Sequence, residues 1–388
     1  MKRAIFAIAF AMVVIAGTSG VSVAYDPSLE VIHEYDDHAS SLVDVEYNPQ
    51  GNTVFSLGEN GSFIAYDIQN DSVEEITNFE AGHALTVGDG TVYIAARDAL
   101  WAFDIASGEL TERTTMEVHP QAIDYDDSRG VVWVGGDGTV YGYDADDGSV
   151  YTTYSAHSEG IVDIHANGDY IASGAGFSNE AVVYDVEAEE VAFRPTLPDD
   201  VRSVSAVHVT GGGGLILGTD AEDGSLVRAY DIAEQEQLVE YREHIFAVSA
   251  LEYDEEHDVI ISMGFDNTVK FFDVDADEVT TVYEHADTIY AGDIDTRNDA
   301  LWIGDGEQRA GTVTAIDIFF EQSTPTPEPT ADPTPESTPE STSDATVTTA
   351  DTPEPTATAE EGSGFGLAVA LFSMTGTAFL LARDHSPF

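Results

Sequence analysis

The histidines of this chain recur at intervals, and histidine is the side chain that most readily ligates metals or exchanges protons near neutral pH. Six of the eleven stand near the start of successive, similar stretches: His38, His83, His119, His157, His244 and His285. If they converged on one face, they could form a metal centre. Alternatively, each makes hydrogen bonds within its own stretch, because buried polar groups require partners. We favour the structural interpretation and predict no metal site.

Acidic turns are the second place where the residue types could do chemistry. Asp137-Gly138, Asp146-Asp147-Gly148 and Asp223-Gly224 supply carboxylates, and calcium prefers several oxygen ligands. None of them has the spacing of an EF-hand loop, and Asp-Gly is also the usual pair in a two-residue hairpin turn. We therefore expect solvated turns at these positions.

Motifs of enzymatic catalysis are missing from the sequence. There is no G-x-S-x-G elbow and no H-E-x-x-H helix, and the glycine run 211–214 lies between strand-like runs, which indicates a hairpin. The absence of cysteine excludes disulfides, thiolate metal sites and cysteine nucleophiles. We predict no catalytic, metal-binding or cofactor-binding residue. The alternative is an extracellular enzyme or cofactor binder that uses calcium or a quinone.

Short β-type runs must position these residues. In His157–Val186, the runs Ile161–Ala166, Tyr170–Gly174 and Ala181–Val186 are separated by turn residues, which predicts an antiparallel meander. The third run contains an aromatic residue followed by aspartate. This step, an aromatic or apolar residue before aspartate, recurs at Asp67, Asp104, Asp144, Asp185, Asp231, Asp273 and Asp317.

Successive steps lie 37 to 46 residues apart, and most are followed by another short run, such as Ser72–Phe79. Four strands in about 42 residues are the signature of a propeller blade. The seven units predict an all-β, seven-bladed β-propeller over residues 25–320. The seventh unit holds only three runs, in 289–294, 300–303 and 311–319. We expect Leu29–Tyr35 to supply its missing outer strand, which removes an open sheet edge.

These units resemble WD repeats, with Tyr or Phe usually in place of the Trp of the terminal dipeptide. Two units, 88–110 and 136–154, are similar instead to quinoprotein-type repeats, whose strand ends in A-x-D-x-x-x-G. Ala102, Asp104 and Gly108 match that ending, whereas Gly142 replaces the alanine in the second unit. Both families form radial four-stranded blades, so the resemblance implies one fold while leaving the family of origin open.

The resemblance also implies a role for the histidines. In WD repeats this histidine belongs to a structural hydrogen-bond set with a Ser or Thr, a loop Asp and the strand aromatic. The positions that match are His38 in the first unit, His157, Ser173 and Tyr184 in the fourth, and His244, Ser262, Asp266 and Phe272 in the sixth. Phe272 has no hydroxyl group and would not take part.

Alignment to the WD pattern places a candidate partner-binding face at the histidine end of the blades. Aromatic residues and arginine are enriched in binding hot spots, and this end carries Phe177, Phe246, Phe265, Tyr290, Arg97 and Arg202. The alternative is that the rings pack against blade edges. Asn60 and Asn70 begin N-x-S sequons and are candidate glycosylation sites.

Acidic residues far outnumber basic residues in this chain, 73 against 13, which gives a formal net charge of −60. At about 1 M salt the Debye length falls to roughly 3 Å, which screens this repulsion. With 43% hydrophobic residues the chain can still form a core. We expect a protein of a high-salt environment, of the haloarchaeal kind. Nucleic-acid binding is not expected, because no basic face could neutralise phosphates.

The two ends of the chain indicate export and anchoring. Lys2-Arg3, an apolar run and the small residues Ser22 and Ala24 predict a secretory signal peptide over 1–24, with an uncleaved anchor as the alternative. Residues 321–363, with twelve threonines and eight prolines, predict a disordered, O-glycosylated stalk. Residues 364–382 are uncharged and suit a transmembrane helix, and 383–388 form a short tail.

The stalk, Gly364-Phe365-Gly366, the apolar segment and Arg383 resemble the C-terminal sorting signals of archaeosortases, in which the helix is exchanged for a lipid. Ser363 stands where that pattern has proline, and one arginine replaces a basic cluster. We therefore expect membrane attachment through either the helix or a lipid. The whole chain predicts a monomeric, non-enzymatic propeller at the outer face of the cell membrane, acting as a scaffold for a protein or glycan of the cell envelope.

Overall fold

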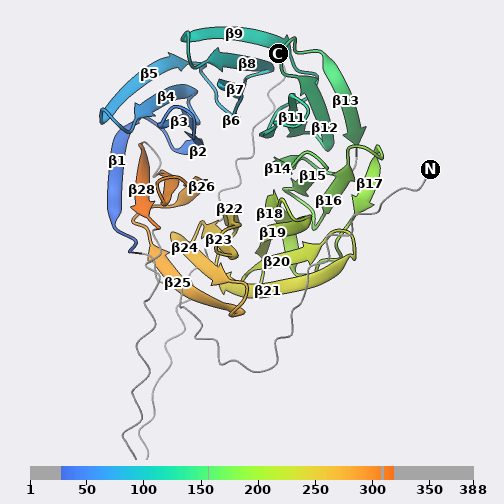
Figure 1. The fold of residues 1–388 in the computed structure, drawn as a ribbon. Helices are drawn as coiled ribbons and strands as arrows, with labels where there is room; N and C mark the ends of the chain where they lie inside the picture. The colour runs from blue at the N-terminus through green and yellow to red at the C-terminus, as the bar shows by residue number, and fades with distance from the viewer. Residues whose placement is uncertain (1–27, 156, 307–309, 319–388) are drawn as a thin grey trace, which may run out of the picture. The chain divides into compact units, whose positions relative to one another are not determined.

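The computed structural model describes residues 28–155, 157–306 and 310–318. Within these ranges the chain forms 28 β-strands, and none of the described residues belongs to a helix that could cross a membrane. The segments predicted as signal peptide, stalk, apolar helix and tail lie outside the described residues. The strands form seven four-stranded antiparallel sheets, arranged as blades around a central axis (Figure 1).

Each blade runs from an inner strand at the axis to an outer strand at the rim (Figure 1). The inner strands of blades 1 to 7 are β2 (Leu42–Asn48), β6 (Ala84–Gly88), β10 (Ala122–Asp126), β14 (Ile161–Ala166), β18 (Val201–Val209), β22 (Val248–Asp254) and β26 (Ile289–Asp295). The second strands are β3 (Thr53–Gly58), β7 (Thr91–Ala96), β11 (Val131–Gly136), β15 (Tyr170–Ala175), β19 (Gly214–Ala221), β23 (Val259–Gly264) and β27 (Ala300–Asp305).

The third strands are β4 (Ser62–Asp67), β8 (Ala99–Asp104), β12 (Thr139–Asp144), β16 (Ala181–Asp185), β20 (Ser225–Asp231), β24 (Thr268–Asp273) and β28 (Gly311–Asp317). The outer strands are β5 (Ser72–Asn78), β9 (Glu109–Thr115), β13 (Val150–Ser155), β17 (Glu190–Phe193), β21 (Glu236–His244), β25 (Glu278–Glu284) and, in blade 7, β1 (Val31–His38). This order confirms the predicted seven-bladed propeller.

The N-terminal strand closes the ring, as predicted. β1 pairs antiparallel with β28, with Val31 opposite Ile316 and Tyr35 opposite Val313. The strand continues three residues beyond the predicted end at Tyr35 and so includes His38. Closure joins chain segments about 280 residues apart and leaves blade 7 with the same four strands as the others.

The core consists of seven apolar clusters, one between each pair of neighbouring blades. Middle strands read as continuous apolar runs because both faces are covered by adjacent blades. All six residues of β11 and of β23 are buried, whereas the outer strand β5 has no buried residue. Burial is therefore highest in the second strands and lowest at the rim, where the acidic residues of the outer strands remain in water.

Two-residue turns join the second and third strands of blades 2 and 3, and short connections do so in blades 1, 5 and 6. Asp137 and Gly138 both have positive φ, at 48° and 76°, which is the backbone of a type I′ hairpin turn. These turns and the linkers between blades lie at the same end of the strands, together with the histidines at the blade starts. We call this end the histidine-end face.

Candidate functional site

Three histidines on the histidine-end face are held in buried hydrogen-bond sets. Between blades 5 and 6, His244 Nε2 lies 2.8 Å from Ser262 Oγ, and His244 Nδ1 lies 3.0 Å from an Asp266 carboxylate oxygen. The Tyr241 hydroxyl donates to the same serine at 2.9 Å. Asp266 also accepts the backbone N–H of Ile245 at 2.9 Å, which fixes the linker into blade 6.

The other two sets repeat this arrangement with different partners for Nδ1. His38 lies 2.7 Å from Ser56 Oγ through Nε2 and 2.8 Å from Ser62 Oγ through Nδ1. His157 Nε2 lies 2.7 Å from Ser173 Oγ. Burial lowers the pKa of both His38 and His157 to about 4. Both rings are therefore neutral near pH 7, and their role is to fasten strands together.

The aromatic member of each set is not the residue expected from the repeat pattern. The hydroxyl that approaches Ser173 belongs to Tyr154, at 3.4 Å, and not to Tyr184. Tyr184 instead stacks on the Tyr154 ring, with centroids 4.2 Å apart. Phe272 stacks on Tyr241 in the same way at 4.6 Å, so its missing hydroxyl group leaves this set intact.

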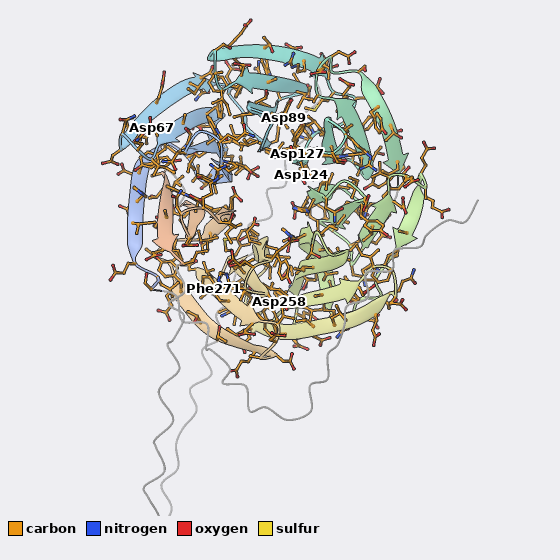
Figure 2. All side chains as sticks on the ribbon, viewed as in Figure 1. Asp67, Asp89, Asp124, Asp127, Asp258 and Phe271 are labelled. Carbon is orange, nitrogen blue, oxygen red and sulfur yellow. The ribbon has the colours of Figure 1, made fainter. Side chains whose placement is uncertain are left out.

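A channel along the propeller axis encloses a cavity of about 200 Å³ between the inner strands. Each blade has one side chain at the same position of its inner strand, and four of these seven, Glu46, Asp124, His165 and Glu252, line the cavity. We call this set the channel ring, and it consists of Glu46, Thr86, Asp124, His165, His208, Glu252 and Asp293. Asp44 and Asp163 lie two residues earlier on β2 and β14 and add two further carboxylates to the lining. Figure 2 labels Asp124 on the inner side of its blade and Asp67 toward the rim.

Four of these carboxylates join neighbouring inner strands, and we call them the latch carboxylates. Asp163 accepts the N–H of Ile164 at 2.9 Å on its own strand and that of Val207 at 2.7 Å on the next blade. The others bridge blades in the same way: Asp44 accepts from Leu85, Asp124 from Ala166, and Asp293 from Tyr47. Each latch therefore satisfies backbone donors that the twist between blades would otherwise leave unpaired.

Glu46 and Glu252, the ring glutamates, differ from the latches. Burial raises the pKa of both well above the usual range, and the neighbouring carboxylates raise it further, while no hydrogen bond opposes the shift. Burial also raises the pKa of Asp44 to about 7, of Asp293 to about 7 and of Asp163 to about 8, against the opposing effect of their backbone hydrogen bonds. The channel thus holds carboxyl groups that share protons near neutral pH.

The two ring histidines do not balance this negative charge. His165 and His208 stack with centroids 4.1 Å apart, and burial lowers the pKa of each. The cavity lining contains no lysine or arginine among the described residues. Within the same residues, no group of three or more Asp, Glu or His side chains is arranged to hold a metal ion.

Two of the acidic turns use a carboxylate to accept a backbone N–H, and Asp147 accepts that of Ser149 at 2.8 Å. Asp137 accepts the N–H of His119 at 3.2 Å. The amides of Asp146 and Asp147 both donate to Asp144. In these contacts aspartate carboxylates accept hydrogen bonds from the protein backbone, as is common at turns.

Four neighbouring apolar side chains on the histidine-end face are exposed, and we call them the apolar platform: Ile245, Phe246, Phe265 and Tyr290, with exposed fractions of 73%, 59%, 40% and 38%. The Phe265 and Tyr290 rings lie 5.4 Å apart. The N–H of Phe265 donates to the carbonyl of Ala247 at 2.9 Å, which holds the Ile245-Phe246 linker beside it. Tyr290 also lines the cavity, so the platform adjoins the channel mouth.

The remaining candidates on this face are placed differently. Phe177 is 66% exposed in the β15–β16 turn of blade 4, two blades from blade 6. Arg97 pairs with Glu80, and Arg202 pairs with Glu222 at 3.0 Å, both in exposed ion pairs. Asn70 is exposed, whereas Asn60 is half-buried and its Oδ1 accepts hydrogen bonds from Ser40 and Ser62.

Reasoning from the sequence missed the channel carboxylates, the platform residue Ile245 and the tyrosines of the hydrogen-bond sets. Two signals could have found them. Tyrosine precedes the histidine by three residues at Tyr35, Tyr154 and Tyr241. Acidic residues stand inside apolar inner strands, as in the Val-Glu-Tyr and Leu-Glu-Tyr steps around Glu46 and Glu252, where an unpaired charge would be costly.

The fold and the ring of inner strands define a seven-bladed β-propeller of four-stranded blades. Among protein families, the one described as outer membrane protein assembly factor BamB matches residues 79–318, and the chain belongs to this family. No curated protein matches the chain.

Two solved structures share the fold. The first, "Structure of U3-55K", has a TM-score of 0.65 at 12% identity, covering 74% of this chain and 99% of that one. The second, the WD40 repeats of RRP9, has a TM-score of 0.65 at 12% identity and covers 75% and 98%.

Proposed function

We propose that this protein is a monomeric, non-enzymatic scaffold, anchored at the outer face of the cell membrane, that binds a protein of the cell envelope through its histidine-end face. The observation that carries the proposal is the apolar platform, in which Ile245 and Phe246 are more than half exposed on a chain with a net charge of −60. Contiguous exposed apolar side chains with a polar surround are typical of interaction sites.

Two further observations support an interaction role. The family is named for an outer membrane protein assembly factor, and propellers of the WD40 type share the fold. The rigid ring positions loops from several blades on one face, which suits recognition better than a mobile loop would. No catalytic motif was found in the sequence, which is why a scaffold is proposed rather than an enzyme or a calcium or quinone binder.

The proposed location depends on the ends of the chain. The signal peptide, threonine-rich stalk and apolar segment 364–382 would export the propeller and hold it at the membrane, through the helix or a lipid. Asn70, exposed at a turn, is the better placed of the two glycosylation candidates. Mass spectrometry of the native protein should find a glycan on Asn70 and should show whether residues 364–388 are retained.

Site-specific photo-crosslinking tests the interaction. A photo-reactive phenylalanine analogue replaces Phe246 in the full chain, and Leu238, 62% exposed on the outer strand β21, serves as the control position. In cells at high salt, we expect a discrete crosslinked protein from position 246 and none from position 238. Equal crosslinking at both positions, or none at 246, would refute the proposed binding face.

A further inference from the structure

The apolar platform borders an opening that is lined by carboxyl groups. Tyr290 belongs to both the platform and the cavity lining. Below it the inner strands present six carboxyl groups, from the four latch carboxylates and the two ring glutamates, and no lysine or arginine lines the cavity among the described residues. Any partner that covers the platform must therefore also lie over these carboxyl groups.

The order of the groups along the channel defines what could enter. Val43 and Val162 share the strand position of Tyr290 at the mouth, and Asp44 and Asp163 follow them directly. Glu46 lies two residues deeper than Asp44, about 7 Å at the rise of a β-strand. A long side chain with an apolar stem and a cationic end could pass the Tyr290 ring, reach the upper aspartates first and then approach the ring glutamates.

We propose that the occupant of the apolar platform is a protein segment in which apolar side chains flank a lysine or arginine, and that this cationic side chain enters the channel mouth. The inference rests on the proposed function and specifies its partner. Charge complementarity excludes a second copy of this chain as the preferred occupant, since each copy carries a net charge of −60. Stacking against Tyr290 adds to the recognition of either cation.

Entry of a cation has a consequence for protons. Burial and the neighbouring carboxyl groups favour the protonated ring glutamates when no cation is bound; the groups around them are Asp44, His83, Thr86, Asp124, Asp163, His165, His208 and Asp293. A bound ammonium or guanidinium favours the ionised carboxylates, so binding releases protons. Binding of a basic segment should therefore strengthen as the pH rises from about 5 to 8.

Selection from synthetic dodecapeptides of random sequence on beads tests the proposal with the full chain in molar potassium chloride. Three variants are compared with the unmodified chain: Phe246→Ser on the platform, the double variant Glu46→Gln with Glu252→Gln in the channel, and Leu238→Ser as control. Both glutamine replacements are isosteric and remove no hydrogen bond among the described residues. The double variant should therefore fold.

We expect the selected peptides to combine apolar residues with at least one lysine or arginine, and to lose binding to Phe246→Ser but not to Leu238→Ser. On the glutamine double variant the same peptides should bind about tenfold more weakly or worse. Peptides that need Phe246 but show no basic residue and no effect of the glutamines would overturn this inference while leaving the proposed function standing. Failure to select any peptide that depends on Phe246 would count against both.

Discussion

Only one of the two stacked aromatic rings beside each buried serine needs a hydroxyl group. Tyr241 and Phe272 stack as a pair, and only Tyr241 reaches Ser262, at 2.9 Å. Tyr241 and His244 both lie on β21, the outer strand of blade 5, whereas Ser262 lies on β23 of blade 6. Each set therefore connects two blades. Phe272 can occupy the strand aromatic position without loss of a hydrogen bond, because Tyr241 supplies the hydroxyl group.

The first prediction compares two tyrosine substitutions. Tyr241→Phe removes the hydroxyl group that donates to Ser262 in a buried site and should lower the free energy of unfolding by about 1–2 kcal/mol. Tyr184→Phe keeps the stacked pair with Tyr154 and should cost less than about 0.5 kcal/mol. Denaturant unfolding in high salt measures both. If Tyr184→Phe cost more than Tyr241→Phe, the hydroxyl group of the strand aromatic would be the important one, and this assignment would be wrong.

At the scale of the strand, the inner strands are joined across blades by carboxylates rather than by backbone pairing. Adjacent inner strands belong to different sheets, so their facing N–H groups lack a ladder partner. Asp124 supplies one acceptor to Tyr125 on its own strand and one to Ala166 on the next blade. A carboxylate with two oxygens suits this geometry, because it can bond to both strands at once.

The second prediction separates latch carboxylates from ring glutamates. Asp124→Ala leaves the backbone donors of Tyr125 and Ala166 without this partner and should destabilise the propeller by about 2 kcal/mol. Glu252→Gln at pH 8 should leave stability unchanged or increase it, since it replaces an ionisable group that lies among other carboxyl groups with a neutral side chain of the same shape. Thermal unfolding of the two variants at the same salt concentration checks the contrast. Equal destabilisation would contradict the distinction.

The third prediction concerns the closing strand. Deletion of residues 29–35 removes most of β1 from its pairing with β28 and exposes the edge of blade 7. Open edges recruit other strands, so we expect unfolding or self-association, seen by light scattering during size exclusion. The control is Glu34→Ala, an exposed position on the same strand. A monomer with unchanged thermal unfolding would show that β1 is dispensable.

Over the whole molecule, two kinds of buried titratable group act in opposite directions. The carboxyl groups of the channel have raised pKa values in the folded state, for example about 8 for Asp163. Their contribution to stability is present at low pH and is lost as the pH rises through those values. His38 and His157 have pKa values lowered to about 4, so their contribution is present above pH 6.5 and is lost as the pH falls toward 4.

The fourth prediction follows from these signs. Between pH 8 and about 6.5 the channel carboxyl groups take up protons while the histidines stay neutral, so thermal stability should increase as the pH falls across this range. Below about pH 6.5 the two buried histidines, whose pKa is lowered, reduce this gain in stability. Calorimetry in molar salt measures the profile. The glutamine double variant at Glu46 and Glu252 should flatten it, and a profile unaffected by that variant would contradict the assignment.

The fifth prediction addresses the net charge of −60. Lowering the salt from molar concentration to about 0.15 M lengthens the Debye distance from roughly 3 to 8 Å, and repulsion between the acidic outer strands should then unfold the propeller. Circular dichroism across a salt series follows this loss. Full stability at low salt would argue against a halophilic setting.

The sequence alone determined the number of blades, their four-stranded composition, the Asp-Gly turns and the closing strand near residue 31. These features depend on strand periodicity and turn chemistry, which act between residues close in the chain. The histidine–serine pairs could be predicted from the resemblance, whereas the tyrosine hydroxyl could not, because the stacked partner comes from another blade.

Only the tertiary structure decided what the channel contains. Asp163 meets the amide of Val207 because adjacent blades turn their inner strands toward one axis, and 44 residues separate the two in sequence. Glu46 and Glu252, over 200 residues apart, likewise become members of one ring. Their altered protonation follows from shared burial and mutual repulsion, which no local sequence pattern encodes. The apolar platform beside that channel is defined by the same closure of the ring.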